Sequence, residues 1–125
     1  MGQGYDRIAK AEDDAKAKGC VIVLPGVREA FVDIDSLDAY AVFDKHAVKL
    51  AEVLPFTYVR RPSPSGRDGH FHVTCTFERD LTPVERITIQ AVLGSDLMRE
   101  LLSFRRYVTG DAAPTLFFEK PGDEG

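Results

Sequence analysis

Hydrophobic residues follow two different periods along the chain. Between Leu37 and Val53 they recur at the spacing of one helix face, whereas in HFHVTCTF, residues 70–77, they alternate with polar residues. The first pattern predicts an amphipathic helix, and the second predicts a strand with one buried face. The complete set of predicted elements is a charged helix over 5–18, strands over 20–24, 29–35, 56–61, 70–77 and 115–120, and helices over 37–53, 83–93 and 95–106.

Particular residues mark the ends of these elements. Ser36 is placed to cap the helix over 37–53, and Pro55 ends it. TPVE, residues 82–85, is a capping box in which threonine caps the helix, proline takes its first position and glutamate reaches back. Pro25-Gly26 separates the first two strands, which predicts a hairpin between them.

The order of elements predicts the fold class. From residue 29 onward it reads β-α-β-β-α(α)-β, in which two βα crossovers surround a hairpin. This is the split βαβ arrangement of ferredoxin-like and RRM-like proteins. We expect an α+β fold whose antiparallel sheet has helices on one face and an open polar face. A single domain is expected, with a peripheral helix over 1–19, an RRM-like unit over 20–120 and a flexible tail over 121–125.

Composition narrows the setting in which the protein acts. A chain of 125 residues suits one domain, and a net charge of -4 means that nucleic-acid binding would need a local basic patch. Cys20 and Cys75 lie far apart, without metal-type spacing, and are expected to be reduced, buried thiols. No apolar run approaches the roughly 18 residues that span a membrane. These features predict a cytoplasmic protein without a membrane partner.

Four polar side chains are predicted to share the open face of the sheet. Alternation places Asp33 and Asp35 on one side of their strand, and His70 and His72 on one side of theirs. The apolar residues between them must face the helices, and the two strands are central neighbours in a split βαβ sheet. The two aspartates and the two histidines are therefore expected to lie within reach of one another.

Close carboxylates repel unless a cation lies between them. Mg²⁺ or Mn²⁺ suits such a site, with substrate phosphates completing the coordination shell, and two such ions can assist phosphoryl transfer. A third acid is left open between Asp96, at a helix start, and Glu119. Glu119 joins the site if the last strand pairs beside 29–35 with Phe117 and Glu119 facing out, which makes Leu116 and Phe118 core residues.

Arginines near the turn over 62–69 supply candidate phosphate contacts. Arg61 lies just before this turn and Arg67 lies within it, and arginine clusters suit phosphate oxygens. A nearby histidine, such as His72, can donate to a phosphate or ligate a softer metal. We therefore expect these three side chains to bind phosphate or nucleic acid.

The first aspartate motif resembles one of a known superfamily. FVDID, residues 31–35, is similar to the h-h-D-h-D strand of the archaeo-eukaryotic primases and primase-polymerases, whose catalytic palm shares the predicted layout. The resemblance implies that Asp33 and Asp35 are catalytic metal ligands. It covers residues 29–120, whereas a full catalytic module of that superfamily is normally larger and has a second subdomain.

The histidine motif extends the same resemblance. SGRDGHFHV, residues 65–73, is similar to the S-G-R-x-G-x-H-x-H-V of small primases, with a turn one residue shorter. Matched from its right-hand end, it implies that His70 is the catalytic histidine that contacts the nucleotide phosphate, and that Ser65 and Arg67 belong to the phosphate-binding turn. FFE, residues 117–119, stands at the place of the third motif and implies Glu119 as a metal ligand where aspartate is usual.

A second resemblance is to the HUH endonucleases, which also use an RRM-like sheet. HFH, residues 70–72, is a literal His-hydrophobe-His and implies a divalent metal and a tyrosine nucleophile, for which Tyr107 is the candidate. The late helix offers Arg105 and Arg106 where that family has a lysine. The segment 85–106 resembles small phage and mobile-element proteins in style.

Three functions remain open from the sequence. The first is a primase-palm-like protein that acts on nucleotides or polynucleotides by divalent-metal-assisted phosphoryl transfer. The second is an HUH-type nuclease that nicks single strands. The third is a palm-derived module that binds single-stranded nucleic acid or a replication protein without catalysis. A homodimer is left open for all three.

Overall fold

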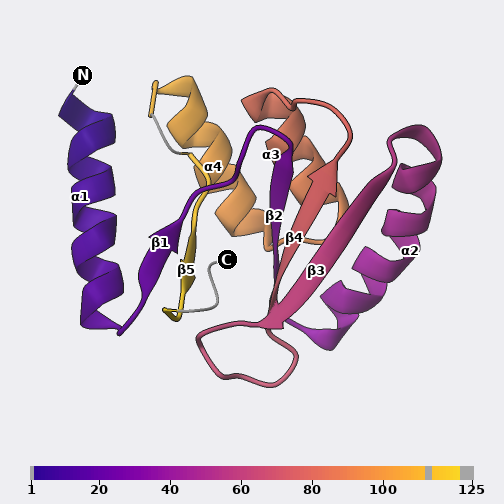
Figure 1. Cartoon of the computed structure of the whole chain (residues 1–125), viewed down its shortest axis with the longest axis horizontal. Helices are drawn as coiled ribbons and strands as arrows, with labels where there is room; N and C mark the ends of the chain where they lie inside the picture. The colour runs from indigo at the N-terminus through magenta and orange to yellow at the C-terminus, as the bar shows by residue number, and fades with distance from the viewer. Residues whose placement is uncertain (1, 112–113, 122–125) are drawn as a thin grey trace.

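The computed structural model describes residues 2–111 and 114–121, with side chains from Ile8 onward. Each predicted helix and strand is present, with small shifts at the ends (Figure 1). The elements in chain order are α1 Gly2–Ala17, β1 Val21–Val23, β2 Glu29–Ile34, α2 Leu37–Val53, β3 Phe56–Pro62, β4 Phe71–Phe77, α3 Pro83–Val92, α4 Leu97–Val108 and β5 Phe117–Glu119. The expected tail over 121–125 lies outside the described residues except for Pro121. No described helix has both the length and the apolar character needed to cross a membrane.

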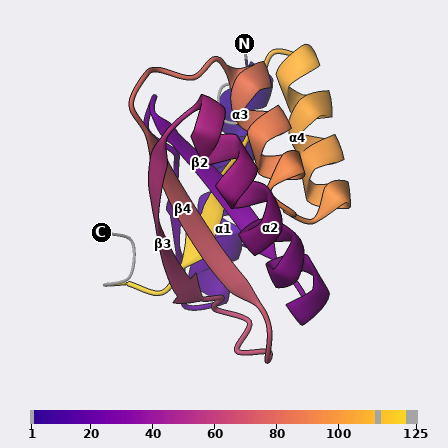
Figure 2. The ribbon, with the colours of Figure 1, turned by 90° about the vertical axis from the view of Figure 1, so that its right-hand side faces the viewer.

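A three-stranded antiparallel sheet forms the centre of the fold. Its strand order is β2-β4-β3, so β4 is the middle strand and β2 lies at an edge. Figure 2 shows α2, α3 and α4 together on one side of this sheet. The α+β class and the split βαβ arrangement predicted from the sequence are therefore confirmed.

The hydrophobic core lies between this sheet and the three helices. Strand alternation supplies its sheet side, through Val32 and Ile34 of β2 and Val73 and Cys75 of β4, all fully buried. Phe43 of α2 is their largest partner from the helices. Burial raises the pKa of the Cys75 thiol to about 12. Cys20 and Cys75 are both buried and free, as the sequence predicted.

The predicted helix caps are present, with one exception. The Ser36 hydroxyl accepts from the backbone N–H of Ala39 at 3.0 Å, and both bonds of the Thr82–Glu85 capping box are made. Helix α4, however, is capped by Asp96 and not by Ser95, which was expected to start it. Ser95 is buried because its hydroxyl binds the backbone of β2 instead.

Side chains from the α3–α4 region occupy the outer edge of β2. Gln90 Oε1 accepts from the backbone N–H of Phe31 at 2.8 Å, and Arg99 donates to the carbonyl of Phe31 at 3.0 Å. Two residues further along β2, the N–H of Asp33 donates to Ser95 Oγ at 3.0 Å. The carbonyl of Asp33 accepts from the N–H of Asp96 at 3.0 Å. These polar groups take the place of another strand.

Buried Glu100 connects these side chains to one another. Its Oε1 accepts from Gln90 Nε2 at 2.7 Å, and its Oε2 accepts from Ser95 Oγ at 2.7 Å and from Arg99. Gln90, Ser95 and Glu100 are each at most 3% exposed. We call Gln90, Ser95, Asp96, Arg99 and Glu100 the edge network, because together they satisfy the free edge of β2.

The predicted hairpin between 20–24 and 29–35 is wrong. Strand β1 pairs antiparallel with β5, in the register Val21 to Glu119 and Val23 to Phe117, and forms a separate two-stranded ribbon. In Figure 1 this ribbon lies between α1 and β2. The physical reason is that the edge network already binds the outer backbone N–H and C=O groups of β2, so none remain free to pair with β1.

The arrangement considered for the last strand, with pairing beside 29–35 and with Leu116 and Phe118 in the core, is not formed. Phe117 and Glu119 are buried, whereas Leu116 and Phe118 are only half-buried. The Phe117 ring lies on the polar face of the sheet, where it stacks on Phe31 with centroids 4.5 Å apart and on His72 with centroids 3.8 Å apart. The polar face is thus partly covered by β5 and not open along its whole length.

The edge network is expected to carry much of the stability of the fold. We predict that Gln90→Leu lowers the free energy of unfolding by roughly 2–4 kcal/mol, because it leaves the buried N–H of Phe31 and one oxygen of Glu100 without partners. Urea denaturation would measure the change. Thr88→Leu, at an exposed position of the same helix, is the matched control and is expected to have little effect. Equal midpoints for the two variants would contradict the importance of the network.

Candidate functional site

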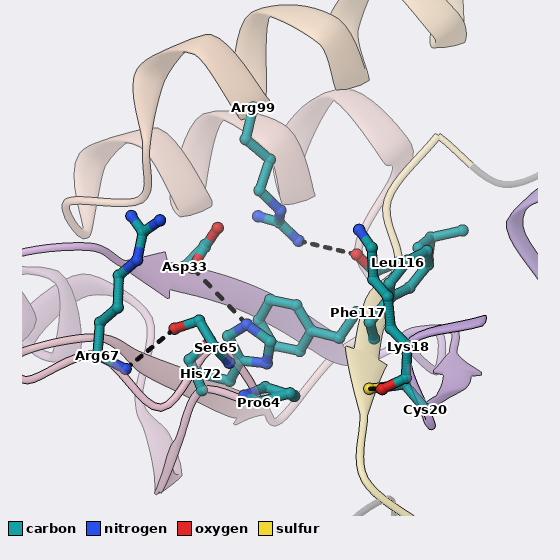
Figure 3. Close-up of a pocket in the computed structure, with 12 residues that line it drawn as sticks. Lys18, Cys20, Asp33, Pro64, Ser65, Arg67, His72, Arg99, Leu116 and Phe117 are labelled. Atoms are coloured by element: carbon teal, nitrogen blue, oxygen red, sulfur yellow. Dashed lines mark hydrogen bonds and ion pairs between the residues drawn. The ribbon is translucent and has the colours of Figure 1, made fainter. Parts of the chain in front are cut away.

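A pocket of about 620 Å³ opens beside the covered part of the sheet's polar face. Four regions of the chain line it: the α1–β1 connection, the central sheet, the turn between β3 and β4, and the segment from α4 to β5 (Figure 3). We call it the Asp33 pocket. Its lining residues are Lys18, Cys20, Asp33, Ser63, Pro64, Ser65, Arg67, His72, Arg99, Leu116, Phe117 and Phe118.

Asp33 and His72 are direct neighbours across the sheet. They are paired in the antiparallel register of β2 and β4, and Arg61 of β3 is the next residue in the same row. The Nε2 atom of His72 lies 3.7 Å from Oδ1 of Asp33. This distance is too long for a hydrogen bond but places the two groups face to face. The convergence of the aspartate strand and the histidine strand, expected from alternation, is present in the structure.

The imidazole of His72 is held from two further directions. Its Nδ1 lies 2.9 Å from Oε2 of Glu119, and Phe117 stacks on the ring at an interplanar angle of 7°. Both neighbours come from β5, at positions two residues apart that point the same way from the strand. The second carboxylate oxygen of Glu119, Oε1, is buried and has no hydrogen-bond partner among the described residues. His72 therefore has a fixed position between two carboxylates.

The electrostatic environment of Asp33 is mixed. Burial raises the pKa of Asp33 above its usual 3.8, and this effect outweighs the lowering caused by Arg99 and His72. Asp96 and Asp35 raise the pKa of Asp33 further. The ionised form of Asp33 thus lowers the stability of the folded state, and carboxylates with such shifted pKa values are common at functional sites.

The turn between β3 and β4 brings hydroxyls and a cation to the pocket. Two glycines with positive φ, Gly66 and Gly69, shape it, and the N–H of Ser63 donates to the carbonyl of His70 at 3.0 Å to close it. Ser63, Ser65 and Arg67 of this turn line the pocket. The Arg67 side chain is exposed and has no ion-pair or hydrogen-bond partner among the described residues.

Several residues predicted from the sequence lie at this pocket. Asp33, His72, Ser65 and Arg67 line it, and Glu119 lies directly behind His72. Between the two acids left open as the third, it is Glu119 that reaches this histidine, whereas the Asp96 carboxylate accepts from the N–H of Met98 at 2.9 Å as a helix cap.

Other predicted residues lie apart from the pocket lining. Asp35 is exposed just after β2, close enough to act on the Asp33 pKa, and His70 is half-buried just before β4. Arg61 lines a smaller neighbouring pocket of about 220 Å³ on the same sheet face. Tyr107, the nucleophile expected from the HUH resemblance, is partly exposed near the end of α4 and lines neither pocket. The metal-binding and phosphate-binding roles assigned to these residues remain predictions.

Within the described residues, no group of three or more histidine, cysteine, aspartate or glutamate side chains is arranged to hold a metal by itself. The pocket offers Asp33 and His72, so any bound cation would take its remaining ligands from water or substrate.

Sequence reasoning missed four residues that build the site. Lys18 and Arg99 supply cations, Phe117 fixes His72, and Ser95 holds the backbone of Asp33. For Ser95 the sequence does contain a signal: Gly-Ser-Asp is a polar connection between two amphipathic helices, and polar residues in a buried connection indicate hydrogen bonds to other parts of the chain. Lys18 carried no signal, because it lies at the end of a charged helix and only the fold brings it to the pocket.

Comparison of the chain with family models, with curated proteins and with solved structures gave no match. The function must therefore be inferred from the chemistry of the Asp33 pocket.

Because burial raises the pKa of Asp33, we predict a pH-dependent stabilisation by Asp33→Asn. Above the raised pKa the ionised carboxylate weakens the folded state, so the asparagine variant should have the higher urea midpoint at pH 7.5. The difference should shrink as pH falls through the raised pKa toward 3.8, since the carboxyl is then protonated in the folded protein. Asp44→Asn, at an exposed site on α2, is the control. A midpoint difference that grows on acidification would contradict the assignment.

Proposed function

We propose that the protein binds the phosphates of a nucleotide or polynucleotide in the Asp33 pocket and acts by divalent-metal-assisted phosphoryl transfer, like a primase palm. The observation that carries this proposal is the charge pattern of the pocket lining. Three cations, Lys18, Arg67 and Arg99, surround a single carboxylate, Asp33. This local excess of positive charge stands against a chain whose net charge is -4. A cytoplasmic location, expected from the sequence, belongs to the same proposal.

The pocket suits a phosphorylated ligand in size and in donors. Its volume of about 620 Å³ lies within the range of roughly 300–1,000 Å³ that is usual for small-molecule sites. Arg67 can present its guanidinium to phosphate oxygens, and the hydroxyls of Ser63 and Ser65 lie on the same turn. Arg99 is fixed by its bonds to β2 and Glu100, so it supplies a positioned charge at the opposite wall.

A divalent cation, Mg²⁺ or Mn²⁺, fits the residues present. Asp33 supplies a partly buried carboxylate whose ionised form a cation would favour. Oε1 of Glu119 is a second buried oxygen, on the far side of His72, and it has no hydrogen-bond partner among the described residues. Asp33 would hold the ion, with substrate phosphates as further ligands. When bound, the ion would neutralise charge on the transferring phosphoryl group. Asp35 and Glu119 remain predicted metal ligands, and His70 remains a predicted phosphate contact.

The chain's own residues have separate parts in this proposal. Arg67 and the serines of the turn bind and orient the phosphates, and Arg99 stabilises negative charge that develops on them. His72, fixed by Glu119 and Phe117, presents Nε2 beside Asp33. Phe117 stacks on both Phe31 and His72 and so covers this side of the site.

Arg67 is expected to contribute to ligand binding directly. We predict that Arg67→Ala weakens binding of a nucleoside triphosphate about tenfold, which corresponds to about 1.4 kcal/mol, because a charge-assisted bond to phosphate is lost. Isothermal titration calorimetry would measure the change. Arg105→Ala, at an exposed site of α4 away from the pocket, is the control and should leave the affinity unchanged. Equal affinities for Arg67→Ala and the unaltered chain would contradict the assigned phosphate contact.

Incubation of the protein with Mn²⁺, nucleoside triphosphates and labelled single-stranded DNA tests the catalytic part of the proposal. Formation of an extended or nucleotide-transferred product that Asp33→Asn abolishes would support it. Binding of the strand without any product would instead favour a non-catalytic palm-derived module. Cleavage with a covalent tyrosine adduct would favour the nicking endonuclease.

A further inference from the structure

We infer that a divalent metal is bound between Oδ1 of Asp33 and Nε2 of His72, with Glu119 as the positioning residue that fixes the imidazole, so that metals with affinity for nitrogen bind in preference to Mg²⁺. The inference deepens the proposed function and rests on it for the role of the metal. It goes beyond the sequence expectation, which names Asp33, Asp35 and Glu119 as metal ligands and leaves a histidine open as a phosphate contact or as a ligand of a softer metal.

The first observation is the geometry between Asp33 and His72. Their facing atoms are 3.7 Å apart, beyond the length of a hydrogen bond. Two ligands of one metal ion, each about 2.0–2.2 Å from it, lie roughly 3–4 Å apart. The two residues are neighbours in the register of β2 and β4, so the sheet itself fixes this spacing. Both line the Asp33 pocket, which gives an ion access from solvent.

The second observation is the environment of the other ring nitrogen. Nδ1 of His72 lies 2.9 Å from Oε2 of Glu119, whose side chain is 3% exposed. A buried carboxylate at this distance accepts a hydrogen bond from the Nδ1–H group, and the Nε2 lone pair is then directed at Asp33. The same chain of carboxylate, histidine and metal orients ligands in many metal sites and raises their basicity. Glu119 thereby acts through His72 and does not need to touch the ion.

The rigidity of the imidazole is the third observation. Phe117 stacks on it with centroids 3.8 Å apart, so the ring cannot turn Nε2 away from Asp33 without breaking this contact. The cation Arg99 also lies near Asp33, where its guanidinium is held by buried Glu100 and by the carbonyl of Phe31. The carboxylates of Asp33, Glu100 and Glu119 outnumber this cation, so an ion between Asp33 and His72 is compatible with these charges.

Ligand chemistry then decides the choice of metal. Mg²⁺ takes oxygen ligands and keeps much of its water, whereas Mn²⁺, Co²⁺ and Zn²⁺ accept imidazole nitrogen. With one carboxylate and one imidazole, the metal-free protein should bind Mn²⁺ at least tenfold more tightly than Mg²⁺, and Co²⁺ or Zn²⁺ more tightly still. Phosphate or water would complete the coordination shell.

Direct metal titration without nucleotide tests this inference separately from phosphoryl transfer. Calorimetry with Mg²⁺, Mn²⁺ and Co²⁺ should give the stated order, and Glu119→Gln should weaken Co²⁺ binding about 10–100-fold, as expected for loss of an outer-shell carboxylate. Glu52→Gln, at an exposed site on α2, should leave the binding unchanged. Equal affinity for Mg²⁺ and Co²⁺, or unaltered Co²⁺ binding by a folded Glu119→Gln variant, would overturn the inference.

Long-range ¹H–¹⁵N NMR of the unaltered, metal-free chain at pH 7.5 supplies a second measurement that does not depend on whether the variant folds. The His72 ring should carry a proton on Nδ1, and its Nε2 resonance should shift on addition of Zn²⁺. An Nδ1 without a proton, or an Nε2 resonance that does not respond to Zn²⁺, would overturn the inference. Metal binding as described, in a protein that transfers no phosphoryl group, would instead contradict only the proposed function.

Discussion

The unpaired edge of β2 is the constraint on which the rest of this structure depends. A strand edge exposes backbone donors and acceptors that need partners when they are buried. Here Phe31 and Asp33 find them in Gln90, Ser95, Asp96 and Arg99, and Glu100 joins most of these groups into one network. The α3–α4 connection thus performs the work of a fourth strand, and it fixes the backbone of Asp33 while doing so.

Because side chains bind the edge of β2, the last strand, β5, is not needed there and pairs elsewhere. Since the outer backbone groups of β2 are already bonded, β5 pairs with β1 in a separate ribbon instead of extending the sheet. Phe117 and Glu119 then reach His72 from above the sheet. A conventional fourth strand beside β2 would have left this histidine exposed. The edge network and the fixed orientation of His72 are therefore two consequences of one topological choice.

The two arginines of the pocket differ in how firmly they are held. Arg99 is held by the edge network, while Arg67 projects from a turn and is unpaired within the described residues. Asp33 lies between them, on a strand that cannot shift without breaking both the sheet and the network. Such an arrangement fixes the carboxylate and leaves one cation adaptable, which suits a ligand whose phosphates must be captured and then oriented.

The sequence by itself determined the elements, the split βαβ arrangement and the shared face of Asp33 and His72, because strand and helix periods are local and alternation fixes which side a residue faces. Only the tertiary structure decided that β1 pairs with β5, that His72 lies opposite Asp33, and that Lys18 and Arg99 enter the pocket. Strand partners and register depend on competition among distant segments. Here that competition was settled by Gln90, Ser95 and Glu100, which are buried on two helices and the connection between them and which no local hydrophobic period predicts.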